Sequence, residues 1–463
     1  MKRSYSCLCQ AASLLCLISL AAPFLLAAQV NSTLPDAPQP RRVMTAQTQT
    51  PQLPNASQST ATTRALQQSV TLEQALNLVK QNNPSLRATQ TLILQNKAQE
   101  ITANLRPNPV LQLDAQYVPL FTPNSFTDSN YWNDQAQFDA GVGYLFERGK
   151  KRQHRLDAAK TATAVTESQV SDTERTVLAN AAQLFIAALL AKSNLEFAQN
   201  LLESYEKTVK IGEEQHNAGA MSQNDLLKIK LQQLQFETDL NTARLARIQA
   251  LASLRQYLGF DSVPADYDVS GRLAYDPVPL KLEDLEARAF NNRPDLQAAQ
   301  RGVVASESQV GLAKANGKVD PNLTFDYTRL NQNNLAAFYF SVPMAIFNRN
   351  QGEIARTQYA LTQAQFQQKA AEQQVLTDVK NAYEGVRSSE QVVQLYDKGY
   401  LDQATQSLDI TKFAYEHGAA SLLDFLDAER SYRSTELSYR QSLATYMTAL
   451  EQLRQAVGHR DLQ

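Results

Sequence analysis

An internal duplication constrains this sequence more than any other feature. The segment 71–86 contains the run Asn-Asn-Pro and returns as the segment 281–296, which contains Asn-Arg-Pro. Later in each copy a glycine, Gly219 or Gly418, is followed six residues on by an aspartate. The spacing between matching positions falls from 210 residues to 199, so the first copy carries an insertion of about eleven residues, which we place at 122–133. Such a chain is expected to fold as one structural unit built twice.

Each copy contains one very long helical segment, at about 149–215 and about 352–416. Neither contains proline, and the second is interrupted only by Gly385 and Gly399. Apolar residues of the first recur at spacings of three and four, as on a buried helix face: Leu178, Ala181, Phe185, Ala188, Leu195, Ala198, Leu202, Tyr205 and Val209. A helix of this length spans roughly 100 Å, which favours a coiled-coil-like assembly over an ordinary globular helix.

Two strands are expected between the helices of each copy, because apolar and polar side chains alternate there. The alternation covers 111–117 and 136–146 in the first copy, and 323–327 and 338–342 in the second. Such strands are typical of transmembrane β-barrels, although a half-buried strand of a soluble sheet alternates in the same way. No apolar run of about 18 residues follows the N-terminal one, so no transmembrane helix is expected and the barrel is favoured.

Four strands in one chain are too few to close a barrel, and an open sheet edge is not tolerated in lipid. Closure therefore requires several copies of the chain. Two copies would give about eight strands, whose interior side chains fill, whereas three would give about twelve and leave a lumen. The polar faces of the strands fit a water-filled passage.

The N-terminus has the layout of a secretory signal peptide. Lys2 and Arg3 precede an apolar run that ends in small residues at Ala28, where cleavage is expected. An uncleaved membrane anchor and lipidation at Cys16 are the alternatives. Pro23 argues against the anchor, and the lack of a small residue just before Cys16 argues against the lipid. All three cysteines lie in this segment, so no disulfide is expected in the mature chain.

The predicted fold class is mainly α with a small β part: a long coiled-coil-like helical tunnel plus four barrel strands from each chain. The segment after the signal is rich in Pro, Gln, Ser and Thr, and it has too few large apolar residues to offset the entropy of ordering. The expected organisation is a signal peptide (1–28), a flexible extension (29–69), a first repeat (70–258), a linker (259–280), a second repeat (281–458) and a tail (459–463).

Several kinds of chemistry are not expected. A net charge of −2 argues against nucleic acid as a partner. The four histidines lack the spacing of metal ligands, and no cysteine remains in the mature chain, so no metal site and no cofactor is predicted. The sequence contains no phosphate-binding loop and no nucleophile or zinc-protease motif. The chain is therefore not expected to be an enzyme.

The duplicated layout of helix, strand pair, long helix and turn resembles that of the TolC-like outer-membrane efflux channels. The likeness covers about 70–458, and its most specific part is 415–428, Tyr-Glu-His-Gly-Ala-Ala-Ser-Leu-Leu-Asp-Phe-Leu-Asp-Ala. The resemblance implies a homotrimer in the outer membrane of a Gram-negative bacterium, with its barrel in lipid and its tunnel in the periplasm. It also implies a periplasmic adaptor and a proton-driven inner-membrane pump of the resistance-nodulation-division type as partners.

Two further segments, 147–152 and 347–352, lie at the expected junctions between barrel and tunnel. They look like the junctions of the heavy-metal-efflux branch, which implies that the cargo is a metal cation. Common ancestry at this boundary would produce the same likeness in a channel for drugs.

The resemblance also assigns roles to single residues. Asp424 and Asp427 match paired aspartates that form an acidic ring at the narrow end of the tunnel, and their spacing places them on one helix face. Asp225 and Tyr415 match residues of the network that holds this end shut. Ala420 stands where the best-known members have an arginine in that network, so different contacts are expected to hold the closed state. Alternatively, these carboxylates only stabilise helix starts through the helix dipole.

Within the family, the turns between the paired long helices form the periplasmic tips that dock onto the adaptor. Small residues there permit close packing of a partner helix. The docking residues that we predict are Gly219, Ala220, Met221, Gly418, Ala419 and Ala420.

The predicted function is a passive exit duct that completes a tripartite exporter of heavy-metal cations or drugs. A structural periplasmic coiled-coil protein without a pore is the main alternative, and it explains the helices but not the amphipathic strands. A secreted hydrolase is disfavoured, because no catalytic group of residues is visible.

Overall fold

The structure is a computed structural model, and it describes residues 69–118 and 129–462. The predicted signal peptide, most of the extension and part of the predicted insertion lie outside these residues. The elements of the first half are β1 (Ser69–Val70), α1 (Leu72–Asn82), α2 (Pro84–Asn104), β2 (Val110–Gln116), α3 (Ser129–Asp134), β3 (Gln137–Leu145), α4 (Lys151–Asn217) and α5 (Gln223–Leu258).

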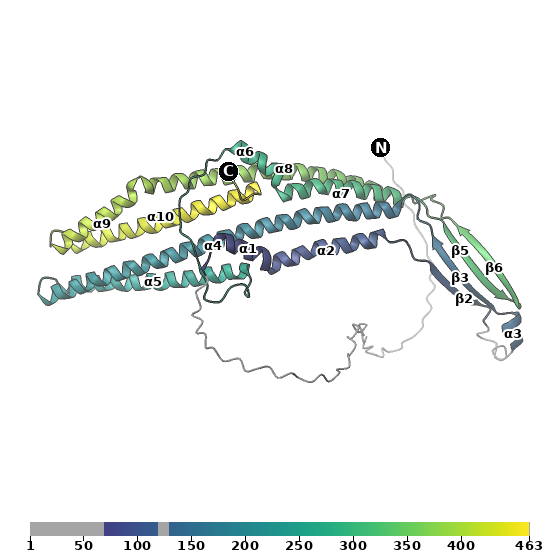
Figure 1. Ribbon diagram of the computed structural model, residues 1–463, viewed down its shortest axis with the longest axis horizontal. Coiled ribbons are helices and arrows are strands. Elements are labelled where there is room, and N and C mark those ends of the chain that lie inside the picture. Colours follow the sequence, from purple (N-terminus) through teal and green to yellow (C-terminus); the bar gives the residue numbers. More distant parts are fainter. Residues whose placement is uncertain (1–68, 119–128, 463) are drawn as a thin grey trace, which may run out of the picture. The chain divides into compact units, whose positions relative to one another are not determined.

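The second half repeats this order with few changes. Its elements are β4 (Asp268–Val269), α6 (Leu282–Asn292), α7 (Pro294–Asn316), β5 (Asn322–Leu330), β6 (Asn333–Ser341), α8 (Gln351–Leu395), the π-helical turn η1 (Tyr396–Tyr400), α9 (Leu401–Glu416) and α10 (Leu422–Val457). Long helices, with one four-stranded sheet and the short pair β1-β4, confirm the predicted mainly α fold class with a small β part. The strands β2, β3, β5 and β6 lie at one end of the long helices, and the turns α4–α5 and α9–α10 lie at the other (Figure 1).

The helices break at places that the pattern of apolar residues does not mark. The helical segment ahead of the strands is divided in both halves, before Pro84 and before Pro294, because proline fits the first position of a new helix. Of the two glycines that interrupt the long helical segment expected over 352–416, only one breaks the helix. The helix stays regular at Gly385 but breaks at η1, where Gly399 has a φ of 111°.

The four longer strands form one antiparallel sheet in the order β2-β3-β5-β6. Its register places Leu111, Val142, Phe325 and Phe338 side by side on one face. The opposite face carries polar residues from the first three strands, among them Gln112, Asp114, Asp139 and Asp326. The predicted alternation of apolar and polar side chains therefore separates the two faces of the sheet.

The two hairpins of the sheet are connected differently. Strands β5 and β6 are joined by Asn331 and Gln332, which both have positive φ, as a tight two-residue hairpin turn requires. Strands β2 and β3 are joined by the much longer segment 117–136, which includes α3. The extra residues of the first copy thus lie between its two strands, although 119–128 is outside the described residues.

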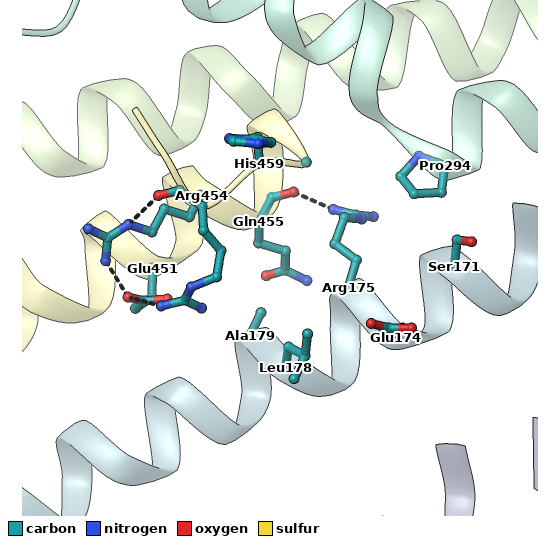
Figure 2. Close-up of a pocket in the computed structure, with 12 residues that line it drawn as sticks. Ser171, Glu174, Arg175, Leu178, Ala179, Pro294, Glu451, Arg454, Gln455 and His459 are labelled. Atoms are coloured by element: carbon teal, nitrogen blue, oxygen red, sulfur yellow. Dashed lines mark hydrogen bonds and ion pairs between the residues drawn. The ribbon is translucent and has the colours of Figure 1, made fainter. Parts of the chain in front are cut away.

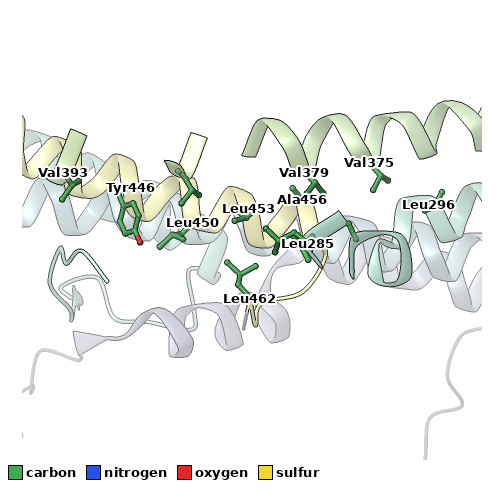
Figure 3. Packing of buried hydrophobic residues seen from close by; sticks show 14 of the residues in the cluster. Leu285, Leu296, Val375, Val379, Val393, Tyr446, Leu450, Leu453, Ala456 and Leu462 are labelled. Atoms are coloured by element: carbon green, nitrogen blue, oxygen red, sulfur yellow. The ribbon is translucent and has the colours of Figure 1, made fainter. Parts of the chain in front are cut away.

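Each half has its own apolar core. In the first half, α1, α4, α5 and β4 pack around residues such as Val79, Phe185 and Leu258. In the second half, α6, α8 and α10 contribute the equivalent cluster. Figure 3 shows this packing for Leu285, Leu296, Val375, Val379, Val393, Tyr446, Leu450, Leu453, Ala456 and Leu462. Burial of these side chains holds the helices of each half together.

Near each core, a side chain at the start of one helix donates a hydrogen bond to a backbone carbonyl at the end of another, and we call this contact a joint. The joint occurs in both halves and so reflects the duplication. Asn83 donates from its side chain to the carbonyl of Tyr257 at 3.0 Å, and Arg293 donates to the carbonyl of Ala456 at 3.3 Å. These donors and acceptors occupy matching positions of the two halves. Only 5% of Asn83 and 3% of Arg293 is exposed. The second joint is ionic, since Arg293 also pairs with Asp295 and Asp378.

Replacing Arg293 with Ala is expected to destabilise the protein by about 3 kcal/mol, because removal of one partner leaves two carboxylates in a partly buried site. The two ion pairs measure 2.5 Å to Asp295 and 2.9 Å to Asp378. The midpoint of thermal unfolding of the purified protein reports the change. Arg356→Ala is the control, since its pair with Glu353 is exposed and little effect is expected. Equal midpoints for both variants would contradict the structural role of Arg293.

One finding differs from the sequence analysis, which expected no helix able to span a membrane. Within the described residues, α4 is long and apolar enough in composition to do so. Several apolar residues of α4, among them Ala182, Phe185 and Leu189, lie in the core of the first half. We therefore assign them to packing between helices.

Candidate functional site

The helices next to the turns α4–α5 and α9–α10 share a third apolar cluster, which we call the tip cluster. Its buried members come from three helices: Tyr205, Val209, Ile229, Phe236, Leu422 and Phe425. Helix α9 adds Leu408 and Tyr415 at its edge. The hairpin α9–α10 is thus held against α4 and α5 mainly by apolar contacts.

The two turns that cap the hairpins have the same hydrogen bonds. The backbone N–H of Ala220 donates to Gln215 at 2.8 Å, and that of Ala419 donates to Ala414 at 2.7 Å. Each turn contains one glycine in the left-handed region that ends a helix. The φ angle is 76° at Gly219 and 72° at Gly418, and open space surrounds the position where either would carry a Cβ.

Most of the predicted docking residues are accessible at these turns. Gly219, Ala220, Gly418 and Ala419 are exposed, and Ala420 is half-buried. Met221 is different, because its side chain turns inward, joins the edge of the tip cluster and lies beside Gly212. Met221 therefore positions its turn rather than presenting a surface to a partner.

Asp225 and Asp424 occupy matching places at the starts of α5 and α10. Ser421 donates to the Asp424 carboxylate from its hydroxyl at 2.7 Å and from its backbone N–H at 3.2 Å. These hydrogen bonds hold the pKa of Asp424 below its usual value. Asp225 likewise accepts from the Ser222 hydroxyl at 2.8 Å and pairs with Lys228 at 3.1 Å, and its pKa is also lowered. Within one chain, both carboxylates act as helix-start acids.

Asp427 lies one turn further along α10 and is exposed. Its one described ion pair is a long, exposed one to Arg430, at 3.5 Å. Asp424 and Asp427 thus form a carboxylate pair on the surface of a rigid helix. Their convergence with other carboxylates requires further copies of the chain.

Tyr415 lies close to Asp225, but the two are not hydrogen bonded to each other. The Tyr415 ring stacks on Phe425, with ring centroids 5.2 Å apart and planes 5° apart. Its hydroxyl is buried and has no hydrogen-bond partner among the described residues. Burial, and then the charge of Asp225, raises the pKa of Tyr415. Within one chain, Tyr415 is thus held by ring stacking and Asp225 by its helix cap, and the predicted network remains a prediction.

A carboxyl group near the tip cluster, that of Glu429, was not expected from the sequence. Glu429 follows Leu422 and Phe425 at helical spacing, so it lies on the buried face of α10, with only 5% of the residue exposed. The signal that could have revealed it was a carboxylate within an apolar stripe. Burial raises the pKa of Glu429 to about 8.

The junction segments between sheet and helices show structural contacts. Lys150 and Asn350, just ahead of α4 and α8, both have positive φ. The Lys151 ammonium pairs with Asp320 at 2.5 Å, and Asn350 donates to the carbonyl of Ala313 at 2.7 Å. The first contact ties the start of α4 to the segment just before β5, and the second ties the start of α8 to α7. Among the described residues, no group of three His, Cys, Asp or Glu side chains could hold a metal ion.

A pocket between α4 and the end of α10 has several charged side chains in its lining, which serve a similar structural purpose (Figure 2). Arg175 donates to the carbonyl of Gln455 at 2.5 Å and pairs with Asp172 at 2.6 Å. Arg454 pairs with the buried Glu451. The charged side chains here bind one another and connect the two halves of the chain.

Known proteins are similar to this chain in both sequence and architecture. A family model described as outer membrane efflux protein matches residues 75–260 and 286–459, one segment in each half. The chain belongs to the outer membrane efflux protein family. It is therefore an efflux channel of the outer membrane and not an enzyme, and the alternative of a rod without a pore is set aside.

Individual relatives of this outer membrane efflux protein are distant. The cobalt-zinc-cadmium resistance protein CzcC of Cupriavidus metallidurans is 22% identical over 384 residues, which cover 82% of this chain and 88% of the relative. Outer membrane protein TolC of Escherichia coli is 21% identical over 422 residues, or 85% of this chain and 83% of the relative.

Solved structures share the fold of this efflux protein. The CusC crystal structure superposes with a TM-score of 0.70 at 19% identity, over 84% of this chain and 92% of that one. VceC of Vibrio cholerae gives a TM-score of 0.68 at 19% identity, over 84% and 97%.

Proposed function

We propose that this efflux protein is a passive exit duct made of three identical chains. The observation that carries the proposal is the four-stranded sheet, whose outer strands β2 and β6 each have only one neighbour among the described residues. Its apolar face is well exposed in one chain, with Leu113 at 71% and Phe338 at 73%. Three such sheets joined edge to edge would turn this face to lipid and the polar face to a lumen.

The helical part of the trimer extends into the periplasm and there meets an adaptor and an inner-membrane pump. We infer that the exposed turn residues Gly219, Ala220, Gly418, Ala419 and Ala420 form the docking surface for the adaptor, with Met221 supporting its turn. The pump is of the proton-driven resistance-nodulation-division type. It supplies the energy, since the duct itself only conducts.

For the cargo we infer heavy-metal cations, with drugs as the other class. Support comes from the name of the relative CzcC, a cobalt-zinc-cadmium resistance protein, and from the junction segments 147–152 and 347–352. The resistance that the gene confers to metal salts, compared with its resistance to drugs, separates the two. Asp424 and Asp427, with Asp225 and Tyr415 behind them, are the residues that we propose to narrow the inner end of the duct.

The full chain in mild detergent is expected to be a trimer, because three four-stranded sheets are needed for a barrel with a lumen. Light scattering and cross-linking measure the number of chains. Introducing charge on the apolar face, with Leu113→Asp, should block insertion into the outer membrane, since charged residues on the lipid side of a barrel are strongly disfavoured. Asp114→Asn on the opposite face is the control and should insert normally. Only monomers or dimers in detergent would overturn the proposed barrel.

A further inference from the structure

The tip cluster contains a carboxyl group that its helix packing leaves without a counterion. Glu429 lies on the buried face of α10, and among the described residues it forms no ion pair within 4.0 Å. Its Oε2 atom is buried and has no hydrogen-bond partner there.

The groups around Glu429 come from every helix that builds the tip. Helix α4 contributes Tyr205, whose hydroxyl is also buried and has no hydrogen-bond partner among the described residues. Tyr205 lies close enough to Glu429 for a negative charge on Glu429 to raise the pKa of the tyrosine, after the larger effect of burial. Lys412 of α9 and Arg433 of α10 are the cations that act on Glu429. Arg433 is already engaged, because it forms an ion pair with Asp239 of α5.

The remaining members of the tip cluster carry no positive charge that could stabilise an ionised Glu429. From α5 they are the apolar side chains Ile229 and Phe236, and from α9 the ring of Tyr415, which is itself influenced by Asp225. A carboxylate buried among such groups loses its hydration without full compensation, so its protonated form is favoured. The pKa of Glu429 is accordingly raised to about 8, mainly by burial and against the opposing effect of Arg433 and Lys412.

The hairpin α9–α10, which carries Glu429, is preceded by a break in the helix at η1. Between the core of the second half and the tip cluster, α8 gives way to η1, and a Cβ at Gly399 would meet nothing within 4 Å. The matching position of the first half is Asn200, where α4 continues without interruption. Helix α9 can therefore change its angle to α8 at η1, whereas α10 of the same hairpin, α4 and α5 have no equivalent break.

We propose that Glu429 is a proton-dependent latch, protonated while the α9–α10 hairpin packs against α4 and α5, and ionised when the hairpin moves away and water reaches it. The proposal rests on the proposed duct only for its consequence, which is that the inner end of the duct opens more readily at higher pH. It assigns a role to a residue that lies outside the predicted constriction.

The direction of the pH effect follows from the two protonation equilibria. A solvated glutamate has a pKa near its ordinary value of 4.5, whereas Glu429 in the packed tip has a pKa of about 8. Between these values the packed state holds one more proton per chain, so lowering the pH favours it. The ratio of packed to open tips should fall by up to about tenfold per pH unit and per chain from about pH 5 to about pH 8, and level off above.

Two measurements on the full-length trimer test the latch. The first is the infrared carbonyl band of protonated carboxyl groups, recorded from about pH 5 to about pH 9 and compared with Glu429→Gln. We expect the wild-type protein to have one extra band that disappears near pH 8 and is missing in the variant. Glu237→Gln, on the exposed face of α5, is the matched control and should keep the band.

The second measurement is the open fraction of single channels in a planar bilayer over the same pH range. The wild type and Glu237→Gln should open more as the pH rises, and Glu429→Gln should stay closed throughout, because glutamine cannot ionise. Glu429→Leu, which also fills the space with a neutral side chain, should behave like Glu429→Gln. If no band depends on Glu429, or if its neutral variants keep the wild-type pH dependence, the latch is wrong. An absence of channels in the wild type would instead contradict the proposed duct and leave the infrared result as the test.

Discussion

Replacing Asp424 and Asp427 together with Asn is expected to weaken block of single channels by multivalent cations on the order of tenfold or more. The same variant should lose most of its preference for cations over anions. In a trimer the pair would be present three times, so carboxylates from all chains would face one axis. A ring of negative charge attracts cations and holds multivalent ones most strongly. Reversal potentials and block titrations in a planar bilayer measure both effects.

The structure sharpens this experiment in two ways. Asn at position 424 can still accept the hydrogen bonds from Ser421, so the start of α10 should remain intact. The lowered pKa of Asp424 means that its charge should persist in mildly acidic solution. Asp402→Asn, at the exposed start of α9, removes a comparable helix-start acid away from the turn and should change nothing. Unchanged selectivity and block in the double variant would leave both carboxylates as ordinary helix-start acids.

Export is expected to be abolished when Gly418 or Gly219 is replaced with Trp, while insertion into the outer membrane continues. A bulky side chain at either turn would project from the exposed surface at which we expect the adaptor to pack. Nothing in the chain itself would be displaced, because the space around both positions is open. The positive φ of each glycine adds a strain of only about 1 kcal/mol for another residue. Survival of a complemented deletion strain on the metal salts or drugs to which the wild-type gene confers resistance measures export.

The control for this prediction separates backbone strain from loss of docking. Asn tolerates the left-handed region better than other residues do, so Gly418→Asn and Gly219→Asn should retain most of the export. Outer-membrane fractionation should find trimers of all four variants in equal amounts. Wild-type export by both Trp variants would place the docking surface elsewhere on the chain.

Much of the architecture could be predicted because the duplication, the long helices and the alternating strands all leave regular patterns in the sequence. Which of the two glycines breaks the second long helix could not be predicted, since Gly385 has the same local signal as Gly399 and remains helical. The difference lies in packing: Gly385 is next to the core residue Val386, whereas Gly399 follows Val393, where that core ends. A tertiary contact therefore decides which glycine interrupts the helix.

In the candidate site, too, part of the structure could be predicted from the sequence and part could not. The turns and their aspartates could be predicted from residue type and spacing, but the partners of each side chain could not. Met221 faces inward because Gly212 leaves room for it, and Asp424 is held by its own Ser421. Glu429 was overlooked because acidic residues on long helices are usually solvated, and only the packing of four helices shows that this one is not.

The two joints, made by Asn83 in the first half and Arg293 in the second, suggest how related chains can differ in sequence and still keep one architecture. The acceptor in each half is a backbone carbonyl, which every residue type carries, so mutation cannot remove it. For this hydrogen bond only a donor of suitable reach is needed, and an amide serves in one half where a guanidinium serves in the other. The two ion pairs of Arg293, by contrast, need a cation. The residue type can therefore differ between the two halves while the hydrogen bond to the backbone is kept. Relatives that share about a fifth of their residues with this chain, such as CzcC at 22%, can therefore retain the same joints with different side chains.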